Sequence, residues 1–252
     1  MKSVRTLFFL PLFCALCVVG CAMPRPQTDP GLDRAAWQSA ARLHAWNQEI
    51  TSSKGTARVR LETSTGMQTY QIAWAARAPD RVRMTFTVSG HPVETVVADG
   101  SQVTFISHTG RHKPHTPASD DPDLEPYTQV PVRLSDLITL LLGQIPVQKF
   151  DDAWFVSHDL FHIRLGRKFS SLSQELILEE DDTIQVLRLL DKEGAARYEI
   201  VFHAFDTMGA YTIPVHMTIF SGKLLKAHIR ITRFWPNIPV KESVFRLTQT
   251  GS

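Results

Sequence analysis

The feature that most constrains the fold of this chain is a long series of segments in which apolar residues recur at every second position. Ala57, Val59 and Leu61 alternate with charged residues, and the same alternation follows at residues 70–76 and 82–88. This period is typical of strands that bury one face and expose the other. The second half of the chain continues in the same way, and the sequence predicts about eleven or twelve strands in total.

Only two segments have the period of a helix, at residues 30–50 and 135–142. Eleven strands about 4.8 Å apart form a sheet roughly 50 Å wide, whereas a helix is about 10 Å across. Because two helices are too narrow to cover the apolar face of such a sheet, the sheet must curl around it. We predict a mainly β (α+β) fold, a single curled antiparallel sheet that forms an unclosed β-barrel with a helical lid, in one domain over residues 31–252.

The first 20 residues differ from the rest of the chain. Lys2 and Arg5 precede an apolar run of 14 residues that ends at Gly20, which is shorter than the roughly 17–25 residues that span a bilayer as a helix. A charged start and a short apolar stretch are typical of a removable secretory signal. A buried core helix would need polar residues every three or four positions, and the run has none. We therefore predict a signal peptide at residues 1–20.

The residues that end this run, Val18 to Cys21, resemble the bacterial lipobox. The resemblance implies that the chain is cut before Cys21 and that its sulfur carries a diacylglycerol. Because Cys14 and Cys17 would leave with the signal, Cys21 would have no disulfide partner. Two or three acyl chains form a stable anchor, whereas one does not. We predict lipid attachment at Cys21 and a proline-rich tether over residues 21–30, with a plain signal peptide and a chance cysteine as the alternative.

Charge and motifs argue against several classes of function. The chain has 27 basic and 25 acidic residues, and removal of Lys2 and Arg5 leaves 25 of each. No basic stripe is interleaved with aromatic residues, so we do not expect nucleic acid as a partner. The motifs G-x-S-x-G and H-E-x-x-H and the P-loop are absent. We predict a protein that is not an enzyme and needs no cofactor, and an enzyme built from dispersed residues stays open as an alternative.

A loop rich in proline, histidine and aspartate contains a cluster with metal-ligating spacing. His108, His112 and His115 lie near Asp120 and Asp121, at intervals that are acceptable for zinc. The residues on either side of the second histidine are cationic and would repel a metal ion, and no cysteine joins the group. We therefore expect a solvated loop rather than a metal site.

Several segments are similar to the LolA/LolB superfamily of lipoprotein carriers, and they occur in the order of that family. They are KGTARVRLE at 54–62, WAARAPDRVR at 74–83, VADGSQV at 97–103, LLLGQIPV at 140–147 and VFRL at 244–247. Members commonly have a tryptophan, a proline, an arginine-rich strand and an ADG hairpin, and they tend to place a strand at the last segment. Each motif is short, and their order together with the lipobox carries the resemblance, which covers most of residues 32–248.

The resemblance implies an apolar cavity that takes up acyl chains. We predict a lipid-anchored protein on the periplasmic face of the outer membrane that takes part in lipoprotein or lipid localisation. Its predicted partners are membrane lipid, the acyl chains of lipoproteins or lipids, and a soluble periplasmic carrier. Ala22 stands where an aspartate retains lipoproteins at the inner membrane of enteric bacteria, which favours the outer membrane. The alternative is a non-catalytic structural lipoprotein that uses the same fold to hold an envelope complex.

The predicted acyl-chain site consists of inward-facing apolar residues of the strands and of the second helix. They are Val59, Leu61, Tyr70, Ile72, Trp74, Met84, Phe86, Val103, Phe105, Leu137, Leu140 and Leu141. For any one of them, a purely structural place in the core is the alternative. The resemblance also implies a protruding, membrane-facing hairpin. Val88 and Val93 occupy the corresponding turn, which lacks the large apolar residue expected there.

Overall fold

Twelve strands form one antiparallel sheet that is not closed into a barrel. The computed structural model describes residues 30–119, 121–128, 132–156, 161–221 and 225–247 of the 252-residue chain. The sheet confirms the predicted mainly β fold. The predicted signal peptide, Cys21 and the tether as far as residue 29 lie outside the described residues, and among the described residues no helix has the length and apolar character needed to cross a bilayer.

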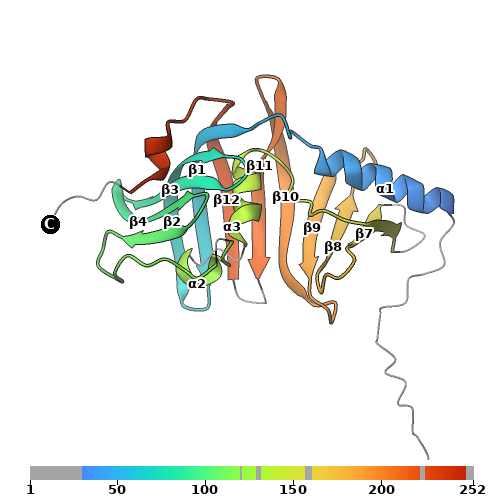
Figure 1. The fold of residues 1–252 in the computed structure, drawn as a ribbon, viewed down its shortest axis with the longest axis horizontal. Coiled ribbons are helices and arrows are strands. Elements are labelled where there is room, and N and C mark those ends of the chain that lie inside the picture. The colour runs from blue at the N-terminus through green and yellow to red at the C-terminus, as the bar shows by residue number, and fades with distance from the viewer. Residues whose placement is uncertain (1–29, 120, 129–131, 157–160, 222–224, 248–252) are drawn as a thin grey trace, which may run out of the picture.

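The strands follow each other along the sheet almost in chain order, and the two halves of the chain meet at its centre (Figure 1). The order is β5-β4-β3-β2-β1-β12-β11-β10-β9-β8-β7-β6. Only the β1–β12 pair joins strands that are distant in the sequence, with Val59 opposite Ile229. Every other pair joins consecutive strands, which is the arrangement that short turns favour.

The strands before the histidine-rich loop are β1 (Ser52–Thr63), β2 (Gly66–Arg77), β3 (Arg81–Val88), β4 (His91–Asp99) and β5 (Val103–Ser107). Those in the second half are β6 (Asp152–Phe155), β7 (His162–Gly166), β8 (Ser173–Leu178), β9 (Ile184–Leu190), β10 (Ala196–Met208), β11 (Tyr211–Ser221) and β12 (Leu225–Pro236). The predicted Asp99-Gly100 turn joins β4 to β5. Gly100 has a φ of 93°, and the Asp99 carboxylate accepts hydrogen bonds from the backbone N–H groups of Ser101 and Gln102.

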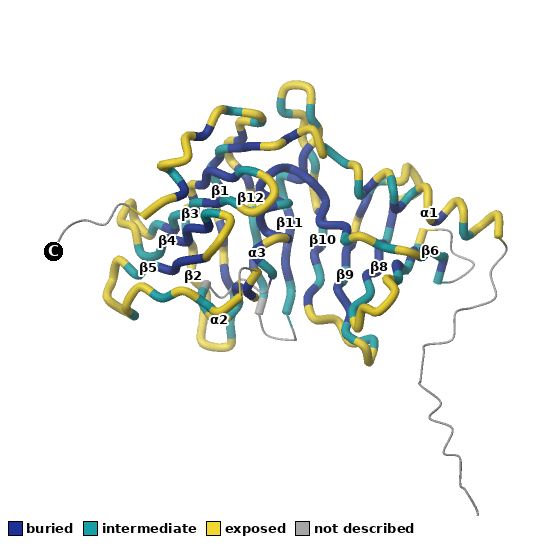
Figure 2. Tube along the Cα trace, viewed as in Figure 1, coloured by how far each residue is buried: buried dark blue, intermediate teal, exposed yellow. Residues whose placement is uncertain are grey.

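The alternation of residues places one apolar face of the sheet on its concave side. In β1, Ala57, Val59 and Leu61 are buried, whereas Arg58 and Arg60 are exposed. Buried residues run along the middle of the strands, and the turns at their ends are exposed (Figure 2). One continuous apolar core includes inward residues from both halves of the sheet.

Helix α1 (Pro30–His44) packs against β6 and β7 and lies across one end of the sheet (Figure 1). The helix ends before the predicted residue 50 because Asn47 adopts a φ of 54°, outside the helical region. The Asn47 side-chain amide donates hydrogen bonds to the carbonyls of Gly143 and Thr212 instead. These tertiary bonds end the helix and connect α1 to the centre of the molecule.

The second predicted helix is α3 (Leu134–Leu141), which lies on the concave face of the sheet. It ends before Gly143 as expected, because that glycine has a φ of 72°, which a glycine adopts without strain. A short helix, α2 (Glu125–Thr128), precedes it in the long loop after β5.

The strand expected at residues 244–247 is not formed, and this prediction is wrong. Glu242–Phe245 forms a 3-10 helix, η1, that packs against β3 and β4. Phe245 is buried with Ala75 and Val240 on the outer face of the sheet. Because β1 to β4 already have a neighbour on each side, they offer no free edge, and the segment covers the outer face instead.

The outermost strands, β5 and β6, are not paired with each other. The backbone of His115 exchanges hydrogen bonds of 3.0 and 3.2 Å with Phe105 and so covers part of the β5 edge. Helix α1 packs against β6 at the opposite end. Covered edges keep an open sheet from pairing with other chains.

Candidate functional site

Beneath α3, side chains nearly fill the concave face. Leu137, Leu140 and Leu141 lie opposite inward residues of β1, β2, β3, β11 and β12, and a cavity of about 30 Å³ remains between them. Ligand pockets usually have about 300–1,000 Å³. Met84 on β3 and Met217 on β11 both line this cavity, although they are four strands apart in the sheet. The sheet therefore curls around this point.

Trp74 ties α3 to the sheet. Its indole N–H donates to the Ser53 hydroxyl at 3.0 Å, and this hydroxyl donates to the carbonyl of Leu141 at 2.6 Å. The residue opposite Trp74 in β1 is Gly55, where an added Cβ would overlap the indole ring. The glycine of the KGTARVRLE segment therefore makes room for the tryptophan that holds the helix.

A larger pocket opens where β2, β3 and β4 meet the loop that follows β5. We call it the mouth pocket, and it has a volume of about 430 Å³. Its apolar and aromatic lining consists of Tyr70, Phe86, Val88, Val93 and Tyr127. The Tyr70 and Phe86 rings meet edge to face at 6.0 Å, and Tyr127 stacks on the buried Phe105 at 4.3 Å. Volume and lining are those of a small-molecule site.

A β-bulge in β4 aims two neighbouring side chains at the mouth pocket. Phe86 pairs with Glu94, but Thr87 pairs with Pro92, so Val93 is an extra residue in β4. Bulges change the direction of side chains in this way. As a result, apolar Val93 and acidic Glu94 both line the pocket.

The other half of the mouth pocket's lining is polar and consists of Gln68, Thr69, Glu94, Thr109 and Arg111. The Glu94 carboxylate lies 3.2 Å from Nε2 of His112, and Nδ1 of that histidine donates to the Lys113 carbonyl at 2.9 Å. The bond to Lys113 and the charge of Glu94 raise the pKa of His112 above its ordinary value. The site thus combines an apolar surface with a charged edge, which fits a molecule that has an apolar chain and a polar end.

The structure divides the predicted site residues into three groups. Tyr70 and Phe86 line the mouth pocket together with the two residues of the predicted membrane-facing turn, Val88 and Val93. The residues that line the small cavity beneath α3 are Val59, Ile72, Trp74, Met84, Leu137, Leu140 and Leu141. The remaining three are buried in the core and line neither space: Leu61, Val103 and Phe105.

The polar lining and Tyr127 were not among the site residues predicted from the sequence. Glu94 carried a usable signal, because it stands two residues before Val96 and four before Ala98, both of which are buried in β4. A carboxylate on the inward side of a strand is unusual unless it is paired, so Glu94 indicated a polar contact on this side of β4. Arg111 and Tyr127 carried no such signal, because they belong to a loop without periodicity.

The histidine-rich loop is organised by its contacts with β4 and β5. Nε2 of His108 lies 2.9 Å from the Thr95 hydroxyl, and the His115 ring stacks on Phe105 at 5.2 Å. In the part of the chain that the structure describes, no group of three or more His, Cys, Asp or Glu side chains is placed to hold a metal ion. Asp120, which belongs to the predicted cluster, lies outside that part.

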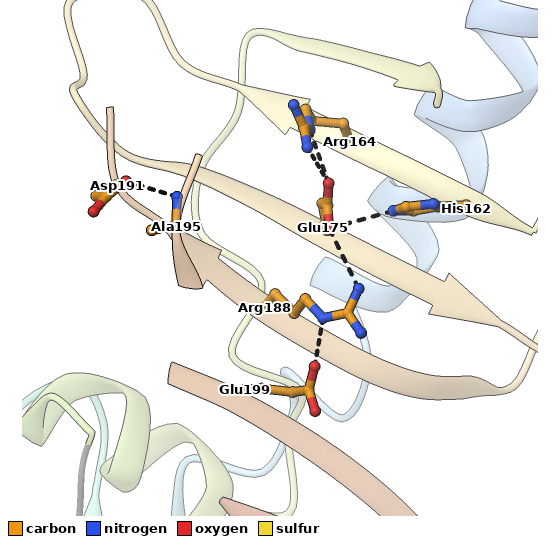
Figure 3. Close-up of polar contacts among 7 residues, drawn as sticks. All are labelled: His162, Arg164, Glu175, Arg188, Asp191, Ala195 and Glu199. Atoms are coloured by element: carbon orange, nitrogen blue, oxygen red, sulfur yellow. Dashed lines mark hydrogen bonds and ion pairs between the residues drawn. The ribbon is translucent and has the colours of Figure 1, made fainter. Parts of the chain in front are cut away.

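A second charged cluster lies on the outer face of β7 to β10 (Figure 3). Glu175 contacts Arg164, His162 at 3.4 Å and Arg188 at 3.6 Å, and Arg188 also pairs with Glu199. Burial raises the pKa of Glu175, but the hydrogen bonds and charge of Arg164 outweigh it and hold this pKa below its ordinary value. The cluster joins four strands, and we interpret it as structural.

Comparison with solved structures identifies the same fold in several bacterial proteins. A DUF1329 family protein from Desulfovibrio piger has a TM-score of 0.63 at 10% identity, over 87% of this chain and 98% of that one. A putative outer membrane lipoprotein-sorting protein domain from Vibrio parahaemolyticus has a TM-score of 0.59 at 12% identity, over 84% and 97%. A LolA superfamily protein from Nitrosomonas europaea has a TM-score of 0.56 at 8% identity, over 86% and 98%.

The TM-scores over most of both chains show a shared fold, and the predicted LolA-like fold is confirmed. A scan against family models and a search of curated proteins found no match.

Proposed function

We propose that this protein binds acyl chains of lipoproteins or lipids, without catalysis, in the mouth pocket and, when α3 shifts, in the separate small cavity beneath that helix. One observation carries the proposal: an aromatic and apolar pocket of about 430 Å³ with a charged edge opens on the concave side of a LolA-like sheet. Uptake of an acyl chain requires burial of apolar surface and no covalent bond, and each buried methylene contributes about 0.8 kcal/mol to the free energy of binding.

The two spaces follow one another along β2. Tyr70 lines the mouth pocket, and the next two inward residues, Ile72 and Trp74, line the cavity beneath α3. With a rise of about 3.3 Å per residue, the path from the first to the last of these is about 13 Å long. Leu137, Leu140 and Leu141 occupy its inner end. An acyl chain that enters at the mouth therefore extends further only when α3 shifts.

The proposed anchor is the acylated Cys21, and the proposed location is the periplasmic face of the outer membrane. The lipobox-like sequence and Ala22 support this placement, as does the likeness in fold to a putative outer membrane lipoprotein-sorting domain. In mass spectrometry, the mature N-terminal peptide is expected to show the added mass of a diacylglycerol on Cys21. An unmodified cysteine there would contradict the anchor.

Binding is tested by titrating the chain from Arg25 onward, which retains every described residue, with the fluorescent fatty acid dansyl-undecanoate. Val93→Trp places a large ring in the mouth pocket and is expected to weaken binding about tenfold or more. The matched control is Thr87→Trp, which adds the same ring in β3, where the threonine hydroxyl bonds the Gln71 carbonyl away from the pocket. It is expected to leave binding unchanged.

Two results would reject the proposal. The first is no increase in dansyl fluorescence with the wild-type chain, and the second is an equal loss of binding in both tryptophan variants. A circular dichroism melt of each variant separates loss of the site from loss of the fold.

A second function is favoured by the small size of the cavity beneath α3, about 30 Å³. A concave face that stays filled by its own side chains would leave the fold to serve as a structural lipoprotein that holds an envelope complex. Co-purification of one envelope complex in fixed stoichiometry, together with no uptake of the fatty acid, would favour this function over the first.

A further inference from the structure

The turn between β7 and β8 exposes one phenylalanine completely. Phe169 has a relative exposure of 107%, while the next most exposed large apolar side chain among the described residues, Met67, has 63%. Phe169 also adopts a φ of 60°, in the left-handed region that residues other than glycine and asparagine rarely occupy. The ring therefore gains nothing from packing, and its backbone is strained.

Hydrogen bonds hold this turn in its shape. The Asp151 carboxylate accepts a bond from the backbone N–H of Lys168 at 2.7 Å. The N–H of Ser170 donates to the Arg167 carbonyl at 3.1 Å, and Leu172 after the turn packs against the core. Because strain persists only where surrounding structure imposes it, the display of the ring is a built feature of the turn.

The immediate surroundings of the ring are basic. Arg167 and Lys168 precede it and are exposed, and Lys149 is exposed beside Arg167 on the neighbouring segment. Two acidic residues lie at the base of the turn: the Asp151 carboxylate accepts a bond from the backbone of Lys168, and Asp152 pairs with Gly166 at the start of β6. An aromatic ring that projects between lysine and arginine side chains is the combination that binds the interface of an anionic bilayer.

The position of the turn agrees with a membrane contact. The Asp151 backbone N–H donates to the Gly166 carbonyl at 2.9 Å, and the preceding residue, Phe150, packs edge to face on Trp37 of α1 at 5.7 Å. The turn is therefore built on the segment against which α1 packs. Nine residue steps separate the start of α1 at Pro30 from Cys21, and an extended chain of that length reaches about 30 Å.

From these observations we infer that the β7–β8 turn is a membrane-contact element. The Phe169 ring enters the interfacial layer of the bilayer, and Arg167, Lys168 and Lys149 bind the phosphates of anionic phospholipids. This inference rests on the anchor proposed at Cys21, which keeps the turn within reach of the membrane. The contact orients the body so that α1 lies near the lipid surface and the turn serves as a second attachment point.

The test uses the processed full chain in vesicles of phosphatidylglycerol and phosphatidylethanolamine. Phe169→Cys introduces a thiol for an environment-sensitive dye, because the sequence has no cysteine after Cys21. Lipids with brominated acyl chains quench a dye that enters the bilayer. We expect a blue shift and strong quenching at position 169, and neither at the matched control Thr65→Cys in the exposed β1–β2 turn.

The charge requirement is tested in the same labelled protein with Arg167→Glu and Lys168→Glu. Quenching is expected to be lost in these variants and to be weak in vesicles of neutral phosphatidylcholine. Equal dye emission at positions 169 and 65 would overturn the inference, and so would quenching that is insensitive to both charge reversals. Dansyl-undecanoate binding should persist in the charge variants, because neither residue lines the mouth pocket. Failure of fatty-acid uptake with quenching intact would reject the proposed function alone.

Discussion

Asp136 is expected to make the stability of this protein decrease as the pH rises from about 4 to 6. It lies in α3 with a relative exposure of 6%, and its carboxylate accepts a hydrogen bond of 2.6 Å from the Tyr198 hydroxyl on β10. Burial raises the pKa of Asp136 to about 6, although the bond from Tyr198 and the charge of Arg133 oppose the shift. At neutral pH the native protein therefore holds an ionised, buried carboxylate on the helix that covers its concave face.

The sign and size of the effect follow from the two pKa values of Asp136. In the unfolded chain the carboxyl has its ordinary pKa of 3.8, against about 6 in the native state. The native state thus binds the proton more tightly, and this contribution is fully present below pH 4 and lost as the pH rises through 6. The difference of about two units between these pKa values corresponds to about 3 kcal/mol in the free energy of unfolding.

The assay compares urea unfolding of the wild type and Asp136→Asn between pH 4 and 7.5. The amide keeps a hydrogen-bonding partner for Tyr198 but does not ionise, so its stability lacks this pH dependence. We expect the free energy of unfolding of the variant, relative to wild type, to increase by about 2.5 kcal/mol between pH 4 and 7, because the unfolded carboxyl is already partly ionised at pH 4. Other carboxylates, such as Glu175, whose lowered pKa acts in the opposite direction, contribute equally to both proteins and cancel.

Tyr198→Phe supplies a second check on the same pair. Without the hydroxyl that lowers the pKa of Asp136, the midpoint of the pH dependence should move upward. A difference between wild type and Asp136→Asn that is constant across the pH range would refute the reasoning. It would show that the carboxyl does not titrate differently in the two states.

Three further substitutions probe packing. Gly55→Ala should lower the free energy of unfolding by about 2 kcal/mol or more, because the new Cβ overlaps the Trp74 ring and approaches the Arg233 carbonyl. A urea unfolding curve with the same midpoint as wild type would contradict this crowding. Phe245→Ala should lower the free energy of unfolding by about 3 kcal/mol, since the residue is 1% exposed on the outer face. A lowered thermal midpoint would show this loss. Phe169→Gly should keep or raise stability, by up to about 1 kcal/mol, through relief of the left-handed φ. A fall of more than that would mean that the ring packs in solution.

Most of the fold was predictable because it follows from local patterns. The alternation of Val59 and Leu61 with arginines determines which side of β1 is buried, and a period of two persists whatever the neighbouring strand is. Asp99-Gly100 supplies the left-handed turn residue that its hairpin needs. The exceptions depend on distant contacts. Asn47 ends α1 through bonds to two carbonyls far along the chain, and Phe245 packs on the outer face rather than extending as a strand.

The candidate site was predicted only in its apolar part. Tyr70 and Phe86 have the inward register of their strands, so their presence at the mouth pocket follows from periodicity. The extra residue at the bulge, Val93, changes the register of β4 locally, and strand periodicity contains no information about such an insertion. Arg111 and Tyr127 reach the pocket because their loop crosses the ends of β2 to β4, and a loop without a period gives no indication of where it will cross.

The sequence by itself determined the faces of the strands, the hairpins between them and the small number of helices, and these together require an open, curled sheet. The tertiary structure decided what lies within the curl. Whether the concave face is hollow depends on where Leu137, Leu140 and Leu141 of α3 pack against Met84 and Met217, which belong to strands from opposite halves of the chain. Close packing between distant segments depends on many contacts at once, and the local sequence pattern of either segment does not specify those contacts.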